Sequence, residues 1–132
     1  AAVRCVVATE CEGGAALLSR LPCGLELTEW HPVRDGARGG RWAFPVMVGA
    51  RVLRPCTHVY NLLLEHTHVL LVGGVPCCTL GHGIDEDVVR HPYWGTQAVV
   101  ADLAAQPGWA EGRVTLGCGG LGARARELPL VH

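Results

Sequence analysis

Short β-type segments separated by glycine or proline are the feature that most constrains the fold of this chain. Residues 3–9, 25–28, 59–65 and 69–75 are rich in Val, Leu and Thr, and each ends near a turn-forming residue. Short strands at such spacing are typical of an all-β sandwich, barrel or rolled sheet. A chain of 132 residues with 49% hydrophobic content is long enough to bury one core. The sequence therefore predicts a single, mainly β domain.

Two further predictions concern the connections between these segments. Residues 10–14 include two adjacent glycines and separate segments 3–9 and 15–21, which predicts a β-hairpin. Residues 41–45 are expected to form a short strand with two aromatic residues on one face, and residues 46–55 a further strand and a turn.

The character of the sequence changes after residue 80. Residues 84–90 carry three consecutive acidic residues, which predict a surface loop. Thr96 is a favourable N-cap for the one good helix, expected at about residues 97–105 and ended by a Pro-Gly pair. We therefore place the folded domain at residues 1–118 and a C-terminal tail at residues 119–132.

Composition narrows the possible partners. The formal net charge of −1 gives no electrostatic reason to expect nucleic acid or an anionic membrane as a partner. No apolar run reaches the roughly 18–20 residues needed to span a bilayer. All 11 basic residues are Arg, which excludes a Schiff-base lysine and a P-loop lysine.

The cysteines indicate the compartment. There are seven, irregularly spaced and without a CxxC pair, whereas a small secreted scaffold has a denser, even-numbered set. Free cysteine packs as a small hydrophobic residue. We therefore expect mostly buried thiols and a cytoplasmic location, with a secreted or cell-surface parent protein left open.

The first candidate site is the Thr28-x-x-His31 tetrad, which lies directly before Pro32. Residues three apart on a strand face opposite sides, so Thr28 and His31 address one site only if the backbone turns between them. After such a turn, the hydroxyl and the imidazole can both hydrogen-bond one peptide group. A histidine with a near-neutral pKa can then protonate a leaving amide nitrogen. The alternative is a structural histidine at a strand end.

A second group comprises Cys77, Cys78 and His82, which would form either a nucleophile pair or half of a zinc site. Adjacent cysteines on a strand point to opposite faces, which argues against zinc and favours buried thiols. His66 and His68 share one face of an extended segment, which fits a metal pair or a polar turn. The histidine pair has no third ligand at a convincing spacing, so we expect no bound metal or cofactor.

An ordered series of motifs carries a family likeness. The sequences LTEWHPVR, RWAFP, VYNLLLE, TLGHG and HPYWGT occur in this order between residues 3 and 117. The series resembles the Hint superfamily of inteins and hedgehog autoprocessing domains, and most of all the Vint domain, the intein-like domain found with von Willebrand A modules. The resemblance implies a Hint-type rolled or horseshoe-shaped β fold.

The resemblance also implies self-processing at a peptide bond. In such domains a Cys or Ser at the first position attacks the preceding carbonyl in an N-to-S or N-to-O acyl shift. Carried over to this sequence, His31 would be the acid that destabilises the scissile amide and Thr28 would orient it. His68 falls at the supporting histidine of the second motif, and Cys77 lies where that strand approaches the centre.

Two departures from the family pattern change what is expected of this chain. The opening block with the nucleophile is missing, and Cys5 lies inside a strand segment. The His-Asn ending of inteins is replaced by Cys78-Thr79, which argues against release by Asn cyclisation. We therefore expect the isolated chain not to cleave, and its partner to be an upstream segment of the same precursor or another protein chain.

Two rival interpretations remain at this point. One is a degenerate Hint domain that serves as a structural or protein-interaction module, which a cluster of exposed Trp30, Trp42 and Trp94 would favour. The other is a small domain stabilised by zinc, which requires metal in the purified protein.

Overall fold

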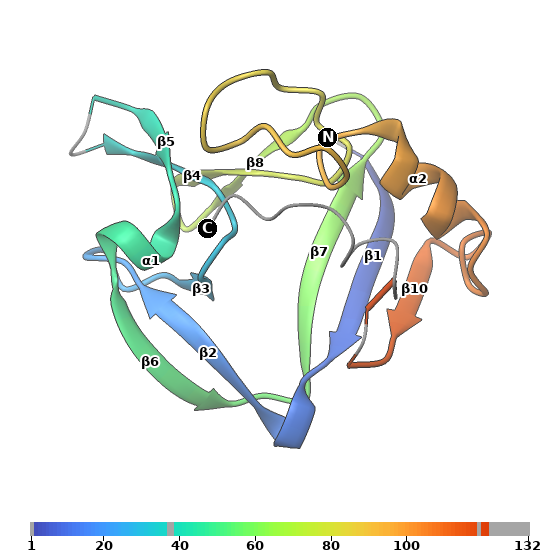
Figure 1. The fold of residues 1–132 in the computed structure, drawn as a ribbon, viewed down its shortest axis with the longest axis horizontal. Helices are drawn as coiled ribbons and strands as arrows, with labels where there is room; N and C mark the ends of the chain where they lie inside the picture. Colours follow the sequence, from blue (N-terminus) through green and yellow to red (C-terminus); the bar gives the residue numbers. More distant parts are fainter. Residues whose placement is uncertain (1, 37–38, 119, 122–132) are drawn as a thin grey trace.

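The protein is a mainly β domain whose strands roll into a horseshoe (Figure 1). The computed structural model describes residues 2–36, 39–118 and 120–121. In them, strands form three sheets with the orders β10-β1-β7, β3-β2-β6 and β5-β4-β9-β8. The predicted fold class is confirmed.

The elements are β1 (Val3–Glu10), η1 (Glu12–Gly14), β2 (Ala15–Arg20), β3 (Glu26–Thr28), β4 (Val33–Asp35), β5 (Arg41–Ala43), α1 (Pro45–Val48), β6 (Ala50–Pro55), β7 (His58–Leu64), β8 (Val69–Val72), β9 (Val75–Cys78), α2 (Gln97–Ala104) and β10 (Arg113–Leu116).

A bent two-stranded ribbon gives the horseshoe its shape. Strand β1 pairs antiparallel with β7, and β2 pairs antiparallel with β6. The ladder continues between the two pairs, because Cys11 N–H donates to the Thr57 carbonyl and Cys56 N–H donates to the Gly14 carbonyl, each at 2.9 Å. Residues 11–14 on one strand thus face residues 56–57 on the other. The longer segment forces the corner at the bottom of Figure 1.

This corner overturns the predicted hairpin between segments 3–9 and 15–21. Strands β1 and β2 do not pair with each other, since each finds its partner in the continuous β6–β7 segment. Gly13 and Gly14 do have positive φ, at 68° and 69°. They turn the chain through the short η1 helix into a corner, and the strands on either side point into different arms of the ribbon.

The β10-β1-β7 sheet, which we call the packed arm, carries the main core. Helix α2 covers it, and nine buried residues gather there: Cys5, Val7, Leu63, Leu80, Tyr93, Val99, Leu103, Val114 and Leu116. Helix α2 confirms the predicted helix. Its N-cap Thr96 accepts a hydrogen bond from Ala98 N–H at 3.2 Å. None of the described helices is long and apolar enough to cross a membrane.

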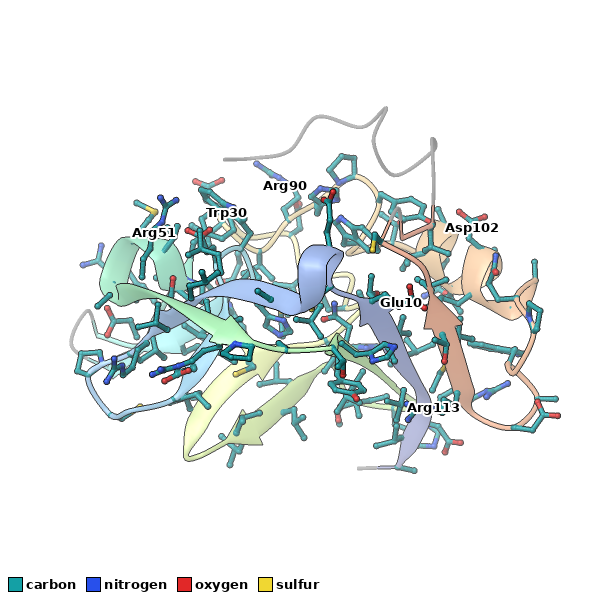
Figure 2. The ribbon with its side chains drawn as sticks, turned by 90° about the horizontal axis from the view of Figure 1, so that it is seen from below. Glu10, Trp30, Arg51, Arg90, Asp102 and Arg113 are labelled. Carbon is teal, nitrogen blue, oxygen red and sulfur yellow. The ribbon has the colours of Figure 1, made fainter. Side chains whose placement is uncertain are left out.

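The β3-β2-β6 sheet, which we call the open arm, is covered far less. Ser19 is its one fully buried residue within the strands, and β6 has none. Figure 2 shows Trp30 and Arg51 on this side of the molecule, across from Asp102 and Arg113 on the side of the packed arm. A small cluster of Leu21, Val33 and Cys77 lies at the far end of the open arm.

Two further predictions need correction or lie outside the described residues. Residues 46–55 do not begin as a strand, because Pro45 starts the one-turn helix α1 and β6 begins only at Ala50. Of the predicted tail at 119–132, the structure describes only residues 120–121, where Leu121 packs against the main core.

Candidate functional site

The tetrad at Thr28–His31 forms a tight turn directly after β3. His31 N–H donates to the Thr28 carbonyl at 3.4 Å, which closes the turn. The predicted change of direction between the two side chains is therefore present. Pro32 follows, and Val33 starts β4 in the third sheet. Glu29 lies in the same turn and pairs with Arg51 of β6 at 2.7 Å, which ties the turn to the open arm.

Thr28 and His31 line a cavity of about 230 Å³. The cavity lies where the end of the open arm meets strand β7 of the packed arm, the segment after β9 and the loop before α2. Its walls are mostly apolar, with a few polar groups on different elements. The lining residues with polar side-chain atoms are Thr28, Glu29, Trp30, His31, Asn61, Thr79, His82, His91 and Trp94.

His31 is anchored by the backbone of β9. Its Nε2 lies 2.8 Å from the carbonyl oxygen of Cys78, so Nε2 carries the proton and donates. In the neutral ring Nδ1 is then the atom that can accept a proton. Burial lowers the pKa of His31, and the bond to the Cys78 carbonyl opposes this in part. The ring is therefore neutral at pH 7, and once protonated it is a stronger acid than an exposed imidazolium.

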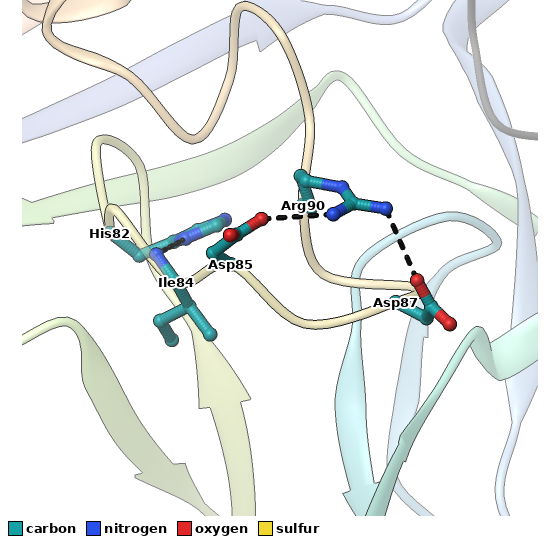
Figure 3. A network of polar contacts seen from close by, with 5 residues as sticks. All are labelled: His82, Ile84, Asp85, Asp87 and Arg90. Atoms are coloured by element: carbon teal, nitrogen blue, oxygen red, sulfur yellow. Dashed lines mark hydrogen bonds and ion pairs between the residues drawn. The ribbon is translucent and has the colours of Figure 1, made fainter.

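His82 is the second histidine of the cavity. Ile84 N–H donates to its Nδ1 at 2.9 Å (Figure 3). A side-chain carbon on Gly95 would lie 2.7 Å from its Cε1. The ring is thus held in one position. Burial is the main cause that lowers the pKa of His82, and the nearby rings of His68 and His91 add to it. His82 is held as a neutral imidazole.

The loop between His82 and α2 closes one side of the cavity. Arg90 bridges Asp85 and Asp87, at 3.0 and 3.2 Å (Figure 3). His91 Nδ1 accepts from the backbone N–H groups of Tyr93 and Trp94, each at 3.0 Å. The predicted surface loop is confirmed, because all three acidic residues are exposed. His82 and His91, which flank this loop in the sequence, nevertheless line the cavity.

His68 and Cys77 do not line this cavity. The His68 carbonyl accepts from Thr79 N–H at 2.9 Å, and its buried Nδ1 has no hydrogen-bond partner among the described residues. Cys77 is buried with Leu21 and Val33, and burial raises the pKa of its thiol to about 11. His68 could therefore support the site only through its neighbour His82, and Cys77 could assist only through its neighbour Cys78. Both expected roles stay predictions.

The adjacent cysteines point to opposite faces, as their strand positions predict. Cys78 packs with Trp42 and Val89, whereas Cys77 packs on the other side of the sheet. Burial and the neighbouring Cys77 raise the pKa of the Cys78 thiol to about 12. Neither thiol is a ready nucleophile at neutral pH. In the part of the chain that the structure describes, no three His, Cys, Asp or Glu side chains are grouped so as to hold a metal ion.

Sequence reasoning missed Asn61 and His91 as cavity residues and weighed His82 only for zinc or as a cysteine partner. Asn61 lies in the VYNLLLE motif, and the two histidines lie in TLGHG and HPYWGT. Their place in these motifs was thus the sequence signal that could have identified them as site residues. Only the fold shows that these three segments meet the Thr28–His31 turn.

Residues 1–128 match the Vint family, described as a Hint-domain. The chain belongs to the Vint family of Hint domains. The resemblance drawn from the motifs is thereby confirmed, and the match extends it at both ends. At the level of the family this is an intein-like domain of the autoprocessing class. No curated protein matches the chain.

Proposed function

We propose that this Vint domain promotes self-processing at a peptide bond held in the cavity beside Thr28 and His31. The observation that carries the proposal is the Thr28–His31 turn, which puts a hydroxyl and an anchored imidazole into one mostly apolar cavity. A mostly apolar cavity with polar groups on several elements suits a neutral peptide group better than a charged small molecule.

The chemistry follows from the state of His31. A thiol or hydroxyl nucleophile attacks the scissile carbonyl, and His31 Nδ1 takes its proton. The carbon–nitrogen bond then breaks, and His31 returns that proton to the leaving amide nitrogen. Burial favours the neutral ring at the start and makes the protonated ring a better proton donor for the second transfer. Thr28 hydrogen-bonds the peptide group and orients it.

The nucleophile comes from an upstream segment of the same precursor or from another chain. Cys78 is the one thiol that lines the cavity among the described residues, and with a pKa of about 12 it supplies little thiolate. The product is a thioester or ester that water or an external thiol then cleaves. The isolated chain is accordingly inactive.

Cleavage of a precursor tests this function. A precursor with a Cys or Ser before Ala1 is incubated with dithiothreitol, and the cleaved fraction is followed by intact mass. We expect His31→Ala to slow cleavage by about 10²–10⁴-fold, the usual contribution of a general acid–base group. His66→Ala is the matched control, because His66 is exposed and outside the cavity, and it should cleave at the wild-type rate. Equal rates for His31→Ala and wild type would sink the proposal.

A cluster of exposed tryptophans would favour the rival function, a structural or protein-interaction module. Trp30 is 39% exposed at the cavity, but Trp42 is buried at 7% and packs with Cys78 and Val89 instead. The three indoles therefore do not form one exposed aromatic surface. A wild-type precursor that resists cleavage under all thiol conditions would nevertheless favour the module.

A further inference from the structure

Three thiols come together at the corner of the ribbon, away from the cavity. Cys11 opens the corner on one strand, and Cys56 lies on the segment opposite. Cys118 lies just beyond β10, whose parallel register with β1 pairs Thr9 with Leu116. The sheet order thus places Cys11 between the other two cysteines.

Cys11 and Cys56 lie on opposite segments of the ladder at the corner. Cys56 Sγ donates to the His58 carbonyl at 2.9 Å. Burial and the neighbouring Cys56 side chain both raise the pKa of the Cys11 thiol. Two backbone hydrogen bonds, from Cys11 N–H to the Thr57 carbonyl and from Cys56 N–H to the Gly14 carbonyl, hold the two segments side by side as in a β-ladder. Both side chains are partly exposed, so an oxidant can reach them.

We propose that Cys11 and Cys56 are a redox site that forms a disulfide across the corner of the ribbon. A small-molecule disulfide such as oxidised glutathione supplies the oxidising equivalents. One thiolate of the pair displaces a thiol from it and forms a mixed disulfide. The other thiolate attacks the protein sulfur, closes the Cys11–Cys56 bond and releases the second thiol. Two protein thiols lose two protons and two electrons, and the small disulfide is reduced to two thiols.

The bond would act on the open arm. The chain between Cys11 and Cys56 contains β2, β3 and β6 and also the Thr28–His31 turn. In the reduced protein the corner is held by backbone hydrogen bonds and by η1, whose residues are all exposed. A covalent link there restricts the unfolded chain and fixes the angle between the arms.

The test oxidises the purified chain with glutathione disulfide and maps its cysteines by mass spectrometry. Cleavage after Glu10, Glu12, Glu29 and Glu65 places Cys11 and Cys56 in separate peptides that contain no other cysteine. We expect one internal disulfide, between the peptides of Cys11 and Cys56. Oxidation should raise Tm by roughly 5–15 °C, and dithiothreitol should reverse the rise.

Matched variants complete the design. Cys11→Ser and Cys56→Ser should each abolish the rise in Tm, whereas Cys23→Ser, at an exposed thiol elsewhere, should keep it. A Cys11–Cys118 link, or thiols that all stay free under oxidant, would overturn the assignment. The peptide map of the wild type gives this answer even if a serine variant fails to fold.

Discussion

The two arms of the ribbon share one continuous backbone ladder but differ in what covers them. The packed arm lies under α2 and holds a nine-residue core, whereas the strands of the open arm bury only Ser19 completely. Exposed ion pairs support the open arm instead: Arg54 and Arg20 meet Glu26, and Arg51 meets Glu29. Apolar burial stabilises more than exposed charge pairs do.

The cavity sits on the border between these unequal halves. The open arm provides Thr28 and His31, and the packed arm provides Asn61. Segments with few buried contacts open locally at low free-energy cost. We therefore expect the wall with His31 to move more readily than the wall with Asn61, which would suit the peptide substrate proposed above.

The largest expected effect concerns the core of the packed arm. Leu103 of α2 is fully buried, and Leu103→Ala should lower the free energy of unfolding by about 2–5 kcal/mol. Leu53→Ala on β6 removes the same atoms from a side chain that is 68% exposed, and should cost less than about 0.5 kcal/mol. Urea denaturation measures both. Similar losses would mean that the arms do not differ as described.

Buried hydroxyls give the next largest contrast. Tyr93 is fully buried and its hydroxyl donates to Asp102 on α2, so Tyr93→Phe should cost about 1–2 kcal/mol. Ser19 of the open arm is equally buried, but its hydroxyl has no partner among the described residues. Ser19→Ala should therefore be neutral or slightly stabilising. A marked loss on Ser19→Ala, by the same denaturation assay, would reveal a hidden role for that hydroxyl.

Protonation of His31 should weaken the border between the arms. Its pKa is lowered in the folded state, so the unfolded chain binds more protons below about pH 6.5. Stability is complete above that pH and falls as the pH drops toward the folded pKa. We expect Tm to decrease between pH 7.5 and 5.5, and to decrease less in His31→Gln. The exposed His66→Gln should follow the wild-type slope, and an unchanged slope in His31→Gln would refute the assignment.

The smallest expected effect concerns the ion pairs of the open arm. The Arg54 guanidinium lowers the pKa of Glu26, so the carboxylate contributes stability above its ordinary pKa, and this contribution is lost as pH falls through the folded value. Glu26→Gln should lower Tm slightly at pH 7, and 1 M salt should erase the difference because the pair is exposed. A difference that survives high salt would point to packing by the side chain.

Much of the fold could be predicted from local sequence. The strand segments, the capped helix at α2 and the turn after Thr28 follow from alternation, from Thr96 and from Pro32. The partner strands of β1 and β2 could not be predicted, because Gly13 and Gly14 allow either a hairpin or a corner. The choice depends on β6 and β7, which lie some forty residues further along the chain.

The same division holds for the site. The sequence by itself determined the family, through motifs in a fixed order, and indicated the Thr28–His31 turn, through the proline that follows it. Only the tertiary structure decided that Asn61, His82 and His91 line the cavity and that His68 and Cys77 do not. The physical reason is that a motif specifies local geometry, whereas a cavity is made by segments that meet only after the sheets have packed.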